Sequence, residues 1–161
     1  MLALRKSNNI IINMMLVAAI IAACINIAIQ LKCLLVGRGL YFGYDTTVEW
    51  KLLVIVFWLF WLIGSVGLLL EKKVSFVFLF PASVLSIVVI LSSLKHVIYK
   101  GGYIQIYYYS GLLISCIILI YLNIGRVREK LSLSKYHYVL GTSMLIIIAV
   151  LFFLVDERQH P

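Results

Sequence analysis

The chain has 161 residues, of which 64% are hydrophobic and only 12% are charged. Soluble globular domains contain about 25% charged residues, so the composition excludes a water-soluble enzyme. It also excludes a disordered chain, because disordered segments are poor in apolar residues. With 14 Lys and Arg against 6 Asp and Glu, the formal net charge is +8. We therefore expect a basic integral membrane protein.

Five stretches of the chain contain no charged residue. They are residues 10–31, 52–70, 74–94, 104–124 and 138–155. About 20 helical residues cross the hydrocarbon layer of a bilayer, so each stretch is long enough to span it. Apolar residues do not alternate with polar ones, which disfavours a β-barrel. The sequence predicts an all-α polytopic membrane protein, in which residues 1–161 form a single transmembrane domain with a bundle of five transmembrane helices.

Lys and Arg predict the orientation of this bundle. The larger share falls on the side of the N-terminus, at Arg5, Lys6, Lys72, Lys73, Arg126, Arg128, Lys130 and Lys135. The other side holds Lys32, Arg38, Lys51, Lys95, Lys100 and Arg158. The positive-inside rule then predicts a cytoplasmic N-terminus and a C-terminus outside. We expect Lys32, Lys51 and Lys95 to snorkel beside helix ends, which strengthens this prediction.

The first stretch also has features of a targeting segment. Arg5 and Lys6 precede an apolar run, and residues 21–24 resemble a lipoprotein cleavage box. The run stays apolar as far as residue 31, so an uncleaved signal anchor is the favoured interpretation.

Uncharged polar residues form stripes on two predicted spans. On the first they are Asn26, Gln30 and Cys33, and on the third Ser83, Ser86 and Ser93. Hydrogen bonding between helices is the favoured interpretation, and a polar path or a docking stripe for a partner helix is the alternative. Gly64, Ser65 and Gly67 lie on the second span. Such small residues allow close helix packing within the bundle, or they seat another protein.

Aromatic residues gather in the two outer loops and at the start of the fourth span. The candidate partner contacts are Tyr41, Phe42, Tyr44, Trp50, Tyr103, Tyr107 and Tyr108. Rings of this kind usually form interfacial belts, and a recognition surface for another membrane component is the alternative. The basic inner loop, residues 125–137, is expected to anchor the topology on anionic headgroups. Its cations form no large patch, so no binding of nucleic acid is expected.

The predicted spans lack the residues that carry most membrane chemistry. None contains Asp, Glu, Lys, Arg or His. Ion-coupled carriers and intramembrane proteases usually need such groups at membrane depth. The three His residues have no metal-ligand spacing, and Cys24, Cys33 and Cys116 form no Cys-x-x-Cys pair. We therefore expect no enzymatic activity, no catalytic or metal-binding residue and no cofactor.

In its size, uncharged spans, excess of basic residues and Ile-, Asn-, Tyr- and Lys-rich composition, the chain resembles two groups of bacterial inner-membrane proteins. These are the phage superinfection-exclusion proteins and the immunity proteins against pore-forming bacteriocins. The resemblance implies a multi-pass protein of the bacterial inner membrane that binds an incoming phage or toxin component and blocks its entry. It transfers no residue role. The alternative is an accessory subunit of a transporter, channel or membrane assembly complex.

Overall fold

The computed structural model describes residues 2–36, 48–100 and 103–157, and all regular structure within them is helical. The helices are α1 (Leu2–Val36), α2 (Val48–Leu69), α3 (Val74–Lys100), α4 (Tyr103–Asn123), α5 (Gly125–Lys130) and α6 (Lys135–Glu157). The all-α prediction is therefore confirmed. Four helical stretches are long and apolar enough to cross a membrane: Ile10–Leu35, Val48–Leu69, Val74–Leu91 and Lys135–Val155. The stretch Tyr109–Asn123 of α4 is apolar but shorter, and the set is compatible with a polytopic membrane bundle.

Most helices run past the charge-free stretches that predicted them. α2 begins at Val48 and α6 at Lys135, where the stretches begin at residues 52 and 138. Charged residues end the apolar part of a helix but not the helix itself. Long basic side chains can lie along the helix while their charge reaches water. A charge-free stretch is therefore a lower bound on helix length.

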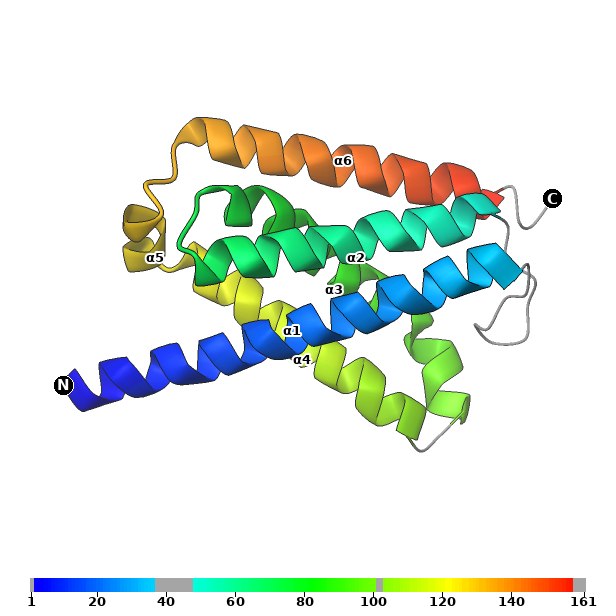
Figure 1. Ribbon diagram of the computed structural model, residues 1–161, viewed down its shortest axis with the longest axis horizontal. Coiled ribbons are helices and arrows are strands. Elements are labelled where there is room, and N and C mark those ends of the chain that lie inside the picture. The colour runs from blue at the N-terminus through cyan, green and yellow to red at the C-terminus, as the bar shows by residue number, and fades with distance from the viewer. Residues whose placement is uncertain (1, 37–47, 101–102, 158–161) are drawn as a thin grey trace.

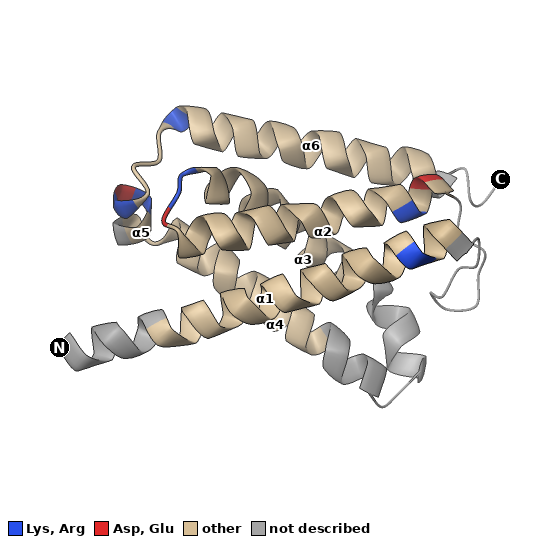
Figure 2. Ribbon diagram, in the orientation of Figure 1, with Lys and Arg blue, Asp and Glu red and all other residues tan. Residues whose placement is uncertain are grey.

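The antiparallel pair α2 and α3 forms the centre of the molecule (Figure 1). α1 packs along α2, α6 packs mainly along α3, and α4 packs against α3. The start of α1, the α2–α3 turn and α5 lie at one end, and the C-terminal ends of α1 and α6 lie at the other. We call the first of these the basic end, because it carries Lys72, Lys73, Arg128, Lys130 and Lys135 (Figure 2).

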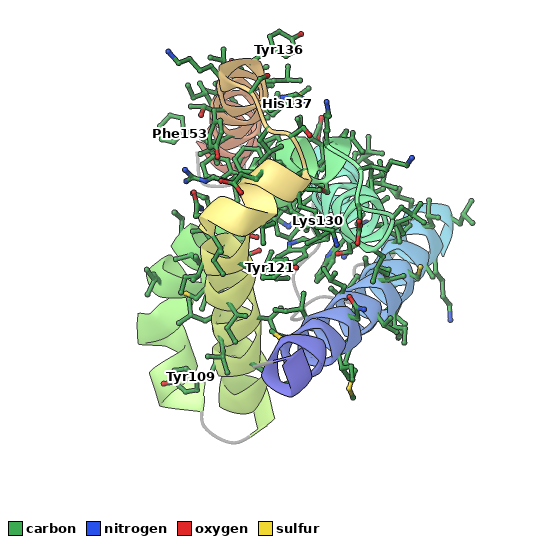
Figure 3. All side chains as sticks on the ribbon, turned by 90° about the vertical axis from the view of Figure 1, so that its left-hand side faces the viewer. Tyr109, Tyr121, Lys130, Tyr136, His137 and Phe153 are labelled. Carbon is green, nitrogen blue, oxygen red and sulfur yellow. The ribbon has the colours of Figure 1, made fainter. Side chains whose placement is uncertain are left out.

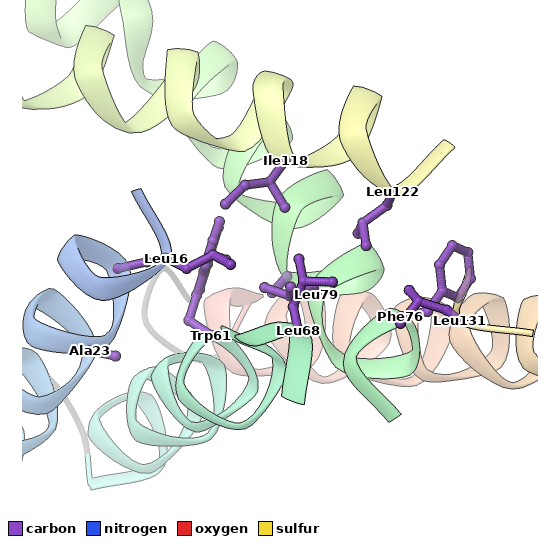
Figure 4. Close-up of a cluster of buried hydrophobic side chains, with 11 residues drawn as sticks. Leu16, Ala23, Trp61, Leu68, Phe76, Leu79, Ile118, Leu122 and Leu131 are labelled. Carbon is purple, nitrogen blue, oxygen red and sulfur yellow. The ribbon is translucent and has the colours of Figure 1, made fainter. Parts of the chain in front are cut away.

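Buried apolar side chains from four helices and the turn after α5 meet in one cluster (Figure 4). Its members are Leu16, Ala19, Ala23, Trp61, Leu68, Phe76, Leu79, Ala82, Ile118, Leu122 and Leu131, with partly buried residues such as Tyr138 of α6 packed against them. Phe76 is completely buried; it stacks on Phe80 with ring centroids 5.3 Å apart, and its ring lies 4.6 Å from that of Tyr138. The cluster thus ties α6 to the central pair.

Close approach of α2 and α3 depends on two glycines of α2. A Cβ atom at Gly64 would lie 2.6 Å from Cγ and 2.9 Å from the backbone nitrogen of Leu79. At Gly67 a Cβ would lie 3.3 Å from the backbone of Ser75. Gly64, Ser65 and Gly67 are all buried. The small face of α2 is thus occupied by α3, which favours packing within the bundle over the seating of another protein.

Candidate functional site

The structure describes the predicted aromatic contacts to different extents. Tyr41, Phe42 and Tyr44 lie outside the described residues. The backbone of Tyr103, Tyr107 and Tyr108 forms the first two turns of α4, and their side chains lie outside the described part. Trp50 is half-buried near the start of α2, where its ring packs edge-on against Phe152 of α6 at 5.6 Å. Trp50 thus joins α2 to α6, and the proposed contact role of the whole set stays a prediction.

The polar stripe of α1 faces the bundle. Asn26, Gln30 and Cys33 are 6%, 5% and 2% exposed, and α2 is the helix packed along α1. The Asn26 amide donates to the carbonyl oxygen of Ala22, 2.8 Å away on its own helix. The periodicity predicted this shared face correctly. The stripe is a buried polar seam, so a partner helix cannot dock on it without displacing α2.

The structure describes the side chains of two residues that were predicted to snorkel, Lys32 and Lys51. The prediction is wrong for Lys51. Lys32 is exposed, as expected, but Lys51 is only 5% exposed. The physical reason is that Lys51 lies in the first turn of α2, and α2 begins beside the C-terminal end of α1, which packs along it (Figure 1). Sequence position alone gave no sign of this, because Lys32 and Lys51 both flank predicted spans.

Hydroxyl groups are buried in the central pair. The Ser86 hydroxyl accepts a hydrogen bond from Trp61 Nε1 at 3.2 Å and donates to the carbonyl oxygen of Ala82 at 2.8 Å. The Oγ atoms of Ser65 and Ser83 are buried and have no hydrogen-bond partner. Ser83 and Ser86 confirm the predicted serine face of the third span for the part that is described. The Trp61–Ser86 bond links α2 to α3, as interhelical hydrogen bonding requires.

One hydroxyl–imidazole pair occurs at the basic end. The Ser134 backbone N–H donates to His137 Nδ1 at 3.2 Å, and the Ser134 hydroxyl lies 2.9 Å from the same nitrogen. Ser134 immediately precedes α6, and His137 follows three residues later. A side chain three residues into a helix that bonds back to the N-cap amide is a capping-box arrangement. Helix capping therefore accounts for this pair, although its atoms are of the types used in nucleophilic catalysis.

Two left-handed residues shape the basic end. Glu71 has φ 55° and Ser132 has φ 48°. After α2, Lys72 N–H bonds to Gly67 O at 2.8 Å and Glu71 N–H to Leu68 O at 3.1 Å. This is the Schellman pattern of helix ends, which usually places glycine at the left-handed position. Matching bonds place Ser132 in the same position after α5, so both turns are tightly defined.

An ion pair joins these two turns. Lys130 Nζ of α5 contacts Glu71 Oε1, and both side chains stay more than half exposed, at 58% and 57%. α5 is held in place because Leu131, directly after it, is buried in the core cluster, and Val127 packs beside it. Arg128 points elsewhere, since its guanidinium lies over the Tyr138 ring, 5.3 Å from the centroid. No sequence pattern signals the Glu71–Lys130 pair, whose members lie 59 positions apart.

A small open groove of about 100 Å³ lies beside this ion pair. Its walls come from α1, the end of α2, α4 and α5, and Figure 3 looks onto this end with Lys130 and Tyr121 between α5 and α1. The apolar residues beside it are Ile12, Leu16, Leu68, Leu69, Tyr121, Val127 and Leu131, of which Leu16, Leu68 and Leu131 are buried in the core cluster. Its polar members, Asn13, Glu71 and Lys130, are exposed and form a charged rim.

The described residues contain no group of three or more His, Cys, Asp and Glu side chains that could hold a metal ion. No protein-family model, curated protein or solved structure matches the chain.

Proposed function

We propose that the chain is an integral protein of the bacterial inner membrane with five transmembrane helices, a cytoplasmic N-terminus and its C-terminus outside. Four long apolar helices support multiple spans. α4 supports the fifth, because it extends over 21 residues from Tyr103 to Asn123. The basic end would then face the cytoplasm, in agreement with the positive-inside rule.

We further propose that the protein is not an enzyme and acts by binding another membrane component, so that incoming phage DNA or a pore-forming toxin cannot enter. The observation that carries this proposal is how polar and apolar side chains are sorted in the described spans. The polar groups Asn26, Gln30, Ser65, Ser83 and Ser86 are buried between helices. The large exposed side chains there are mainly aliphatic. A surface of this kind can dock on another protein within the bilayer, and a steric mechanism needs nothing more.

The mechanism we propose is obstruction: the bundle occupies the channel or injection apparatus and prevents its assembly. Tyr41, Phe42 and Tyr44 are the candidate contacts on the outer side, together with Tyr103, Tyr107 and Tyr108. Aromatic residues are enriched at the contacts that dominate binding energy in interfaces.

The test is protection of a bacterial host. Cells that express the protein are challenged with phages and pore-forming bacteriocins, and adsorption is measured separately from the entry of DNA or toxin. We expect normal adsorption and blocked entry. The triple variant with Ala at 41, 42 and 44 should lose protection while its amount in the membrane is unchanged. Tyr136→Ala is the control, because Tyr136 is an exposed aromatic residue at the basic end.

Retained protection in the triple variant would refute the assignment of these contacts. Host cells that admit every attacker equally would favour the accessory-subunit alternative. A specific observation supports that alternative: only 11% of the apolar window of α6 is buried, which leaves a long helix face for a dedicated partner. A stoichiometric partner that stays bound in mild detergent would then be expected.

A further inference from the structure

We propose that helices α1 and α2 separate at the end of the molecule opposite the basic end, and that this opening admits water to the buried polar seam between them. We call this part of the α1–α2 contact the polar joint, and we define it by Gln30 and Cys33 of α1 and Lys51 of α2. The C-terminal end of α1 and the beginning of α2 lie side by side there (Figure 1). The proposal rests on the side chains that the joint buries, and it is independent of the proposed blocking of phages or toxins.

The two halves of the α1–α2 contact differ in their chemistry. In the half nearer the basic end, α1 contributes only apolar residues to the core cluster: Leu16, Ala19 and Ala23. In the other half, the buried residues of α1 are Asn26, Gln30 and Cys33. Amide and ammonium groups lose their bonds to water when two helices close over them, whereas apolar side chains have no such bonds to lose. The apolar half therefore holds the pair together, and the polar half is the part that can open.

Lys51 gives the strongest reason for an opening. Its side chain is 5% exposed, and it makes no ion pair or hydrogen bond with another described residue. Glu49 is the acid nearest to it in the sequence, but residues two positions apart on a helix do not face each other. An ammonium group that is buried without a partner is strongly disfavoured. Separation of the two helix ends returns water to this charge and so lowers its free energy.

Gln30 adds a second contribution, which involves no charge. It is also 5% exposed, and its amide makes no hydrogen bond with another described residue. A buried amide without a partner costs free energy in the closed joint, and water supplies the missing bonds when the joint opens. Local openings of this kind occur where few buried apolar contacts hold a region in place. Lys51 and Gln30 thus favour the open joint together.

Cys33 is a natural reporter of the opening, because it is only 2% exposed in the closed joint. The full-length protein is placed in lipid nanodiscs with Cys24→Ala and Cys116→Ala, so that Cys33 is the single thiol. A water-soluble maleimide reacts with this thiol only while the joint is open. Both membrane faces are accessible in a nanodisc, so the test does not depend on the orientation of the protein. We expect steady labelling of Cys33, at a rate well below that of the unfolded chain.

Replacement of the two polar groups should close the joint. Lys51→Met keeps a long side chain without the charge. It should slow the labelling of Cys33 by about tenfold, within the range gained when buried charges are replaced by apolar residues of similar volume. Gln30→Leu should slow the labelling to a smaller extent. Because Gln30 carries no charge, this variant separates closure of the joint from an electrostatic change in the reactivity of the thiol.

Lys32→Met is the matched control. Lys32 lies at the same end of α1 but is exposed, so the labelling of Cys33 should not change. A second control places the thiol in the apolar half, with Ala23→Cys and Cys33→Ala, because Ala23 is 0% exposed on the same face of α1. This thiol should react at least about tenfold more slowly than Cys33, since the apolar half opens with the whole fold. Circular dichroism establishes that each variant keeps its helices.

Three outcomes would overturn the proposal. One is faster labelling in Lys51→Met, which would indicate that the lysine is paired with an acid of the chain and holds the joint closed. Another is an equal slowing in Lys32→Met and Lys51→Met, which would indicate a general effect of charge on the thiol. The third is labelling of Cys33 no faster than that of the thiol in the apolar half. Protection of host cells enters none of these measurements, so failure here leaves the proposed function standing.

Discussion

Helices α3 and α6 have the same mean hydropathy in their apolar windows but very different places in the molecule. Half of the α3 window is buried, against 11% for α6. α3 presents small or hydroxyl-bearing residues to its neighbours, among them Ser75, Pro81, Ala82, Ser83 and Ser86. In α6 the described buried residues are only Gly141 and Ile148. Hydropathy thus places a helix in the membrane, but it does not decide which helix becomes central.

The physical reason is that lipid tails are as apolar as a leucine side chain. Burying another leucine therefore gives little net driving force, and close contact and interhelical hydrogen bonds decide the arrangement. This contrast between the central helices and α6 can be tested by paired substitutions in the two regions.

The largest effect is expected at Gly64. Gly64→Val places side-chain atoms where Leu79 already lies. The backbone nitrogen of Leu79 cannot move aside easily. We expect the free energy of unfolding in detergent to fall by about 3 kcal/mol, the upper part of the usual range for overpacking. Ala149→Val on the exposed face of α6 is the control and should change little. Equal effects at both positions would contradict the central role of the α2–α3 contact.

A smaller effect is expected when a large side chain is removed. Phe76 of α3 is 0% exposed and Phe153 of α6 is 63% exposed. Phe76→Ala should lower the free energy of unfolding by about 2 kcal/mol, below the cost in a water-soluble core, because lipid reduces the transfer part of that cost. Phe153→Ala should leave it unchanged. The measurement is chemical unfolding followed by circular dichroism, and a neutral Phe76→Ala would show that the core cluster does not hold the bundle.

The smallest effect is expected at the Trp61–Ser86 hydrogen bond. Ser86→Ala removes the acceptor of Trp61 Nε1, at an expected cost of about 0.6 kcal/mol, the average for such bonds in membrane bundles. A double-mutant cycle with Trp61→Phe isolates the bond itself. Ser143→Ala on the exposed side of α6 serves as the control. If the cycle gives no coupling energy, the bond contributes nothing to the pairing of α2 and α3.

Much of this fold follows from local features of the sequence. The charge-free stretches located the apolar helices that the structure describes, and the i, i+4, i+7 spacing of Asn26, Gln30 and Cys33 identified a buried face. The short helix α5 was missed, because the region was read only as a basic loop. Val127 and Leu131 carried its signal, since two apolar residues four positions apart share one helix face.

The rest depended on contacts between distant parts of the chain. The partner of Glu71 is Lys130, and no local pattern selects one lysine of the basic end over another. The burial of Lys51 likewise depends on where the end of α1 comes to lie. The groove needs residues from α1, α2, α4 and α5 together, so it has no sequence signature of its own.

The left-handed turns bear on which substitutions the chain can accept. A residue with a side chain costs about 1–2 kcal/mol in this conformation compared with glycine. Glycine at position 71 or 132 should therefore relax the backbone, and at 132 it removes only a small hydroxymethyl group. At position 71 the same change also removes the carboxylate that meets Lys130. A library that covers both positions should accordingly accept glycine freely at 132, while its effect at 71 would depend on whether selection acts on folding or on the charge at the rim.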